Sequence, residues 1–157
     1  MIWFDIKKLE KELIDENLSD KEGFNYLLAN MILFSVAPYI AVDRYENSWL
    51  TFVEVVITIF ITVIMLRTTY DINLKGSENK DYFKRFLGLS FVSGVRLVVY
   101  VVVAAIPVGI FMALAGKLVT VDRGTKDILM LAMQIAIAIV YYFMLTNSFR
   151  RVNGEVK

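Results

Sequence analysis

Four long apolar stretches, separated by polar segments, run along the chain at about 24–42, 49–66, 86–115 and 128–145. A helix rises about 1.5 Å per residue, so roughly 20 residues cross the ~30 Å hydrocarbon layer of a bilayer. Each stretch is near or above that length, and a chain this short has too little polar surface to cover four such helices in water. The pattern therefore predicts an all-α, polytopic membrane protein with four transmembrane helices. The third stretch exceeds one crossing, which predicts a tilt, a surface turn or a kink at Pro107.

Residues 1–18 precede the first span and follow another pattern. Their apolar positions recur at steps of three, three and four: Trp3, Ile6, Leu9 and Leu13. That spacing predicts an amphipathic helix that lies on the membrane or across the ends of the spans. Directly after it, Ser19 and Glu22 have the spacing of a capping box, so a new helix is expected to begin at about Asp20.

The distribution of lysine and arginine predicts the orientation. Twelve of these residues lie in the N-terminal segment, the loop after the second span and the C-terminal tail, against four in the two other loops. Cytoplasmic loops carry such an excess. We therefore expect a cytoplasmic amphipathic helix over 1–18, a transmembrane bundle over 19–149 and a cytoplasmic tail over 150–157, in a bacterial inner membrane.

Composition narrows the chemistry. Hydrophobic residues make up 57% of the chain, above the roughly 45–50% that is usual in soluble domains. The net charge of +1 points to no nucleic-acid partner, and the chain has neither cysteine nor histidine. Disulfides, thiolate metal sites, the usual general base and the commonest metal ligand are thereby excluded. We expect no enzyme activity, no metal and no cofactor.

Two charged residues lie inside the apolar stretches. Arg96 is about 15 Å from Phe86 along its helix, and Glu54 is about 18 Å from Leu66, so both are expected at a similar depth. A charge at the centre of a bilayer is costly and is usually buried in the bundle and paired. The sequence therefore predicts an ion pair between Glu54 and Arg96 that joins the second and third spans.

Other polar side chains are expected to gather around this pair. The predicted intramembrane network contains Asn30, Glu54, Arg96, Tyr100 and Gln134. A second set, Thr51, Glu54, Thr58 and Thr62, has steps of three, four and four and forms one polar stripe on the second span. Such groups either hold the helices in register or mark an ion, proton or ligand pathway, and both interpretations stay open.

Small and interfacial residues predict further contacts. Small residues four apart let helices approach closely in membranes, and they occur here as Ala105, Gly109 and Ala113, as Ser90 and Gly94, and as Ala132 and Ala136. One such set is free to serve a homo-oligomer. Aromatic and basic residues at the span ends are expected to contact lipid headgroups: Trp3, Trp49, Lys80, Lys84 and Arg85.

Three functions fit these features. The first is a non-catalytic membrane anchor, sensor or regulatory subunit that forms a homo-oligomer, contacts membrane lipids and binds a cytoplasmic protein partner. The alternative is an oligomeric ion channel or pore with the Thr51/Glu54/Thr58/Thr62 stripe facing its axis. A small-solute carrier is third, because four spans without a repeat offer little room for a midplane cavity.

Overall fold

The protein is all-helical over the part of the chain that the structure describes. This computed structural model describes the backbone of residues 1–40, 48–75, 81–115 and 122–155, and their side chains except those of 34–40, 48 and 108–115. Within these ranges there are five helices and no strand: α1 (Ile6–Ile14), α2 (Asp20–Ile40), α3 (Ser48–Lys75), α4 (Tyr82–Ala115) and α5 (Arg123–Val152).

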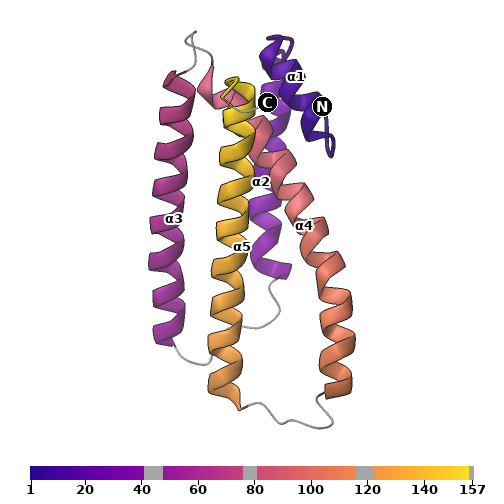
Figure 1. Cartoon of the computed structure of the whole chain (residues 1–157), viewed down its shortest axis with the longest axis vertical. Coiled ribbons are helices and arrows are strands. Elements are labelled where there is room, and N and C mark those ends of the chain that lie inside the picture. The colour runs from indigo at the N-terminus through magenta and orange to yellow at the C-terminus, as the bar shows by residue number, and fades with distance from the viewer. Residues whose placement is uncertain (41–47, 76–80, 116–121, 156–157) are drawn as a thin grey trace.

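Three helices are long and apolar enough to cross a membrane. They are Trp49–Lys75, Tyr82–Pro107 and Arg123–Val152. They correspond to the predicted second, third and fourth spans. The predicted first span, 24–42, runs into residues that the structure does not describe, and α2 is not among the three. The third span is one helix that continues through Pro107; it slants away from its neighbours along its length (Figure 1).

Successive long helices run in opposite directions, and both termini lie beside α1 at one end of the bundle (Figure 1). We call this end, which holds α1, the starts of α2 and α4 and the ends of α3 and α5, the terminal end, and the other the distal end. Only some of the helices that follow each other in the chain are neighbours in space. α3 packs mainly on α5. α5 also packs on α4, and α4 packs on α2. The described parts of α2 and α3 make no direct contact.

The buried core lies entirely at the terminal end. Its fully buried side chains include Leu9, Tyr26, Leu89, Val92 and Phe149. By contrast, no described side chain is buried in 49–64 of α3, in 94–107 of α4 or in 122–144 of α5. These distal halves carry many exposed apolar side chains, including Phe60 at 65% and Val103 at 60% exposure. The chain is therefore tightly packed at one end and open at the other.

α1 lies at the terminal end, where it packs on α4 and α5. Asp5 caps its start by accepting a hydrogen bond from the amide of Lys8 at 3.1 Å. At its end, Glu16 has a left-handed φ of 56°, and the amide of Asn17 donates to the carbonyl of Glu12 at 2.9 Å. The predicted apolar face is confirmed at its three helical positions, Ile6, Leu9 and Leu13, which are buried. This face packs on α4 and α5, and the placement of α1 relative to a membrane stays a prediction.

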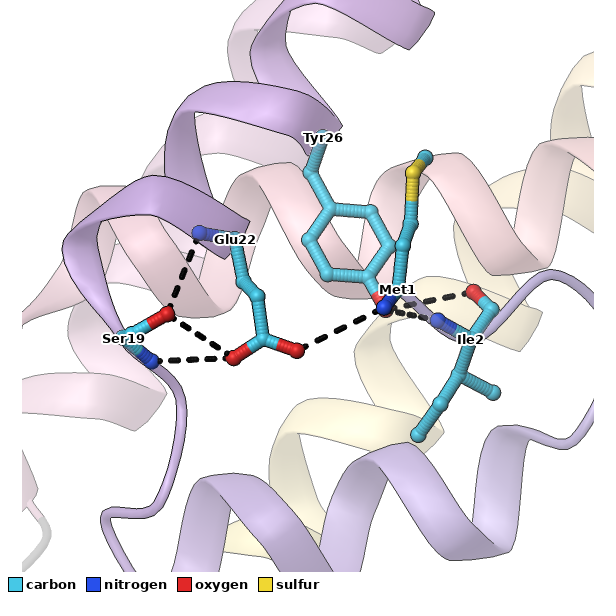
Figure 2. Close-up of polar contacts among 5 residues, drawn as sticks. All are labelled: Met1, Ile2, Ser19, Glu22 and Tyr26. Carbon is cyan, nitrogen blue, oxygen red and sulfur yellow. Dashed lines mark hydrogen bonds and ion pairs between the residues drawn. The ribbon is translucent and has the colours of Figure 1, made fainter.

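The capping box at the start of α2 is confirmed. The Ser19 amide donates to Glu22 Oε2 at 3.1 Å, and the Glu22 amide donates to Ser19 Oγ at 3.3 Å. Figure 2 shows that Glu22 also faces the amino group of Met1, which lies 3.4 Å from Oε1. One turn on, the hydroxyl of Tyr26 accepts from the amide of Ile2 at 2.8 Å and donates to its carbonyl at 3.1 Å. The N-terminal segment is thus fastened to α2.

Candidate functional site

The predicted ion pair between Glu54 and Arg96 does not form. Glu54 is half-buried on α3 and has no hydrogen bond or ion pair among the described residues. Arg96 donates from Nη2 to the hydroxyl of Tyr100 at 2.8 Å, and its guanidinium carbon lies 5.7 Å from the centre of that ring. The physical reason is the helix order. α5 packs against α3, and the distal halves of α3 and α4 lie on opposite sides of the molecule (Figure 1).

Arg96 instead faces the N-terminal segment. It lines a groove of about 420 Å³ on the outer side of α4, together with Tyr100 and residues just before and within α1: Phe4, Asp5, Ile6 and Lys7. Two members of the predicted network, Arg96 and Tyr100, do contact each other. The common interior that was to join them to Glu54 and Gln134 is not present among the described residues.

Asn30 occupies the buried polar position expected of it, with different partners. Its side-chain amide donates to the carbonyl of Tyr26 at 2.9 Å and to that of Leu87 at 3.0 Å. Since Asn30 is on α2 and Leu87 on α4, the second bond fastens these two helices together. It leaves Asn30 no role in a network with Arg96. Gln134 is half-buried on α5.

Part of the threonine stripe lines a cavity. A cavity of about 500 Å³ lies between α2 and α3 because those helices do not contact each other. Residues of α4 and α5 complete its lining. Thr58 and Thr62 line it, with Asn30, Ser90 and Tyr141 as the other polar groups. Its remaining lining is apolar: Leu27, Met31, Ile61, Met65, Leu66, Phe86, Leu87 and Ala138. The size is typical of a small-molecule pocket. Thr51 and Glu54, nearer the distal end, are not part of it.

Two polar clusters at the terminal end were not predicted. In the first, Arg151 of α5 donates to Glu10 of α1 through Nε at 3.0 Å to each carboxylate oxygen and through Nη2 at 2.6 Å to Oε1. Nη2 also donates to Ser148 at 2.9 Å. The side chain of Glu10 is 8% exposed and that of Arg151 40%. A bidentate pair of this kind is both strong and directional, so it clamps α1 onto α5.

The second cluster surrounds Arg85, which corrects another prediction. Arg85 was expected at the lipid headgroups, but it is only 4% exposed. Its Nη1 donates to the side-chain oxygens of Asn73 at 3.2 Å and Asn153 at 2.8 Å, and Asn153 donates in turn to the carbonyl of Ile72. Its Nη2 is buried without a hydrogen bond. The residue joins α3, α4 and α5 instead of facing lipid.

The other expected interfacial residues divide into two groups. Trp3 and Trp49 are 59% and 64% exposed, as a lipid contact requires. Lys84 forms an ion pair with Asp20, whose pKa is lowered chiefly by a hydrogen bond from Lys84. Lys80 lies outside the described residues.

The predicted small-residue contacts are made only near the terminal end. Ser90 is buried and its carbonyl accepts from Tyr141 at 3.2 Å. A Cβ on Gly94 would lie 3.8 Å from Leu33, so α4 runs close to α2 there. Ala105, Ala132 and Ala136 are exposed. The side chains of Gly109 and Ala113 lie outside the description. At Gly88, which the prediction missed, α4 runs close to α1, with Leu9 3.5 Å from the Cβ position.

Fold and composition together define a class of protein. Three apolar helices of spanning length in an all-helical chain indicate an integral membrane protein. Within the described residues there is no group of three or more acidic side chains placed to hold a metal ion. Comparison of the chain with protein-family models, with curated proteins and with solved structures finds no match.

Proposed function

We propose that this chain is a non-catalytic integral membrane protein that acts as a homo-oligomeric anchor, sensor or regulatory subunit. The observation that carries the proposal is the uneven packing. All of the described core is at the terminal end, where α1 is clamped by Glu10 and Arg151, and none of the described side chains in the distal halves of α3, α4 and α5 is fully buried. Such a chain offers a rigid platform to a partner outside the bilayer and apolar faces to lipid or to other copies within it.

We assign α2 as the fourth span and the terminal end to the cytoplasm of a bacterial inner membrane. α2 has 21 residues, which is about the length of one crossing, and it runs beside α4 (Figure 1). The excess of basic residues in the segments at the terminal end supports the orientation.

Oligomerisation is proposed through the exposed face of α5. Leu129, Met133, Val140 and Phe143 are between 47% and 59% exposed, and Ala132 and Ala136 lie between them. Native mass spectrometry of the protein in detergent is expected to detect an oligomer that Ala132→Phe and Ala136→Phe dissociate, because a bulky ring keeps two backbones apart. Val98→Phe, on the exposed face of α4, serves as the matched control. A monomeric parent, or equal dissociation by all three variants, would contradict the assignment.

The cytoplasmic contact is proposed for the outer face of α1. Lys8 and Lys11 are exposed there, while the opposite face is buried in the bundle. A photocrosslinking amino acid at position 8 or 11 is expected to give an adduct with another protein in intact cells, and the same residue at Phe60 in the apolar part of α3 is not. Lys8→Glu combined with a crosslinker at 11 should remove the adduct. Adducts only with further copies of the chain would reject a separate partner.

An ion channel is the second candidate, favoured by Glu54. This carboxylate lies in an apolar span and has no hydrogen-bond or ionic partner among the described residues, so it needs water or another copy of the chain to solvate it. A ring of such carboxylates favours cations. Planar-bilayer recordings are expected to show a cation conductance that Glu54→Gln reduces, with Val56→Ala, exposed on the same helix but off the threonine stripe, as the control. An electrically silent parent protein removes this candidate.

A further inference from the structure

The groove beside Arg96 contains an unusual set of side chains for a membrane-facing surface. Its lining residues are Phe4, Asp5, Ile6, Lys7, Arg96 and Tyr100, and we call it the α4 groove. It lies between the N-terminal segment and the outer side of α4, so it faces away from the cavity between α2 and α3. Neither the capping box nor the Glu10 clamp involves it.

Arg96 brings an uncompensated positive charge to this groove. It lies about 20 Å along α4 from Tyr82, inside a helix of spanning length and composition. Its one hydrogen-bond acceptor among the described residues is the neutral hydroxyl of Tyr100, and no carboxylate pairs with it. A guanidinium at membrane depth requires an anion or water, and this one is half-buried beside a groove.

The remaining charges of the groove leave it positive. Lys7, on the first turn of α1, is exposed and adds a second cation. The single carboxylate is Asp5, and it caps α1 by accepting from the amide of Lys8. Two cations against one engaged carboxylate favour an anionic ligand, and arginine matches the geometry of phosphate oxygens particularly well.

The surroundings of the groove indicate where the anion comes from. Trp3 and Phe4 are 59% and 52% exposed at its edge, and the ring of Trp3 packs edge-on against Phe91 at 5.3 Å. Exposed aromatic residues of this kind gather at the membrane interface. Beyond the groove, α4 presents apolar side chains such as Val98 and Val102, at 51% and 56% exposure. The groove therefore combines two cations with exposed aromatic rings at one end and an apolar helix face beyond them.

We propose that the α4 groove binds an anionic phospholipid, with Arg96 and Lys7 on the headgroup phosphate and the acyl chains along the exposed valines of α4. A phosphate held in the groove can contact the guanidinium of Arg96 while the apolar stem of that side chain stays beside the helix and the acyl chains. The lipid then supplies the counter-charge that the described residues do not.

The two tryptophans allow a direct test. The chain contains two, so Trp49→Phe leaves Trp3, at the edge of the groove, as the only indole. Quenching of Trp3 fluorescence is measured in phosphatidylcholine vesicles that contain an equal fraction of either brominated phosphatidylglycerol or brominated phosphatidylcholine. We expect stronger quenching by the anionic lipid. Arg96→Gln and Lys7→Gln should each lower its relative binding constant about five-fold, as for a basic residue near an anionic surface.

Controls separate the possible outcomes. Lys11→Gln removes a lysine of α1 that does not line the groove and should leave the preference unchanged. Lys7 is exposed, so its variant reports on the site even where Arg96→Gln fails to fold. Equal quenching by the two lipids, or a preference that survives both groove variants, overturns the proposal. So does inorganic phosphate at millimolar concentration that removes the preference, because it would assign the site to a free anion.

Discussion

At the residue scale, the polar side chains inside this fold were easier to find than to pair. Arg96 and Asn30 stand out in the sequence as polar residues among apolar ones, and the structure gives both of them specific partners. Glu10 also had a detectable signal: it lies four residues after Ile6 and three before Leu13, which places it on the apolar face of α1. Its partner Arg151 is 141 positions away. Spacing within one helix cannot show which distant residue meets it.

The Glu10–Arg151 clamp predicts an asymmetry between its two partners. Arg151→Met should lower the free energy of unfolding by about 3 kcal/mol, because it leaves the carboxylate of Glu10 buried and unpaired. Glu10→Met should cost about 1 kcal/mol, since the half-exposed Arg151 can turn to water. Unfolding by sodium dodecyl sulfate in mixed micelles, followed by circular dichroism, measures both.

The double variant completes this experiment. Combining Glu10→Met with Arg151→Met should restore part of the loss of the arginine variant, because no buried charge then remains. Lys8→Met, on the exposed side of α1, is the control and should be neutral. Equal losses for the two single variants would show that Glu10 does not depend on Arg151 for its counter-charge.

At the element scale, the apolar stretches located the helices and underestimated their length. α3 continues to Lys75 beyond the predicted end at Leu66, and α5 continues to Val152. The cause is the change of environment at the terminal end. There α5 packs on α1, and α3 packs on α5 and α4. These contacts bury polar side chains such as Thr69 and Ser148, so the composition no longer resembles a segment surrounded by lipid. Hydropathy detects the bilayer-facing part of a helix and misses the part that packs on protein.

The space between α4 and α1 at Gly88 sets how large a side chain this position accepts. A Cβ there would lie 3.5 and 3.6 Å from the two methyl groups of Leu9 and 3.8 Å from the ring of Tyr26, which are ordinary contact distances. Gly88→Ala should therefore leave stability unchanged or raise it slightly through better helix propensity. Gly88→Leu should lower it by about 1–3 kcal/mol through overpacking. The same mixed-micelle unfolding distinguishes the two, and a large loss for alanine would contradict the observed spacing.

The capping box of α2 predicts a dependence on pH. Hydrogen bonds from the Ser19 amide and hydroxyl lower the pKa of Glu22 below the usual value of 4.5. The bound carboxylate therefore stabilises the fold above about pH 4.5, and this contribution is lost as the pH falls through the lowered pKa. At pH 7, Glu22→Gln should reduce stability by about 0.5–1 kcal/mol.

Comparing the variants across pH isolates this effect. The difference between the parent and Glu22→Gln should shrink as the pH falls through the lowered pKa of Glu22, because the protonated side chain is neutral like that of glutamine. Glu155→Gln removes an exposed carboxylate near the C-terminus and should follow the parent at every pH. A difference for Glu22→Gln that stays constant from pH 7 to 3 would mean that the charge of Glu22 does not stabilise the helix start.

At the scale of the whole molecule, helix order was the step that the sequence could not supply. Pairing Glu54 with Arg96 assumed that consecutive spans lie side by side, which is the usual arrangement. Here α5 packs on α3 instead. The contact between α3 and α4 is near the terminal end, where the hydroxyl oxygens of Thr69 and Tyr82 lie 3.0 Å apart. All these faces are apolar, so periodicity does not distinguish the one that meets a neighbour from the one that meets lipid. The same order leaves α2 and α3 apart and opens the cavity between them.

The number of membrane crossings follows from where the two termini lie. With α2, α3, α4 and α5 all spanning, positions 8 and 155 are on one side of the membrane and position 122, at the start of α5, is on the other. With three spans, positions 8 and 155 lie on opposite sides. The chain has no cysteine, so single cysteines at these positions can be labelled with a membrane-impermeant maleimide without background. In sealed vesicles of one orientation we expect positions 8 and 155 to react alike and position 122 to react only after the vesicles are opened or inverted. Labelling of 8 and 155 from opposite sides would remove α2 from the membrane and, with it, the four-helix bundle proposed here.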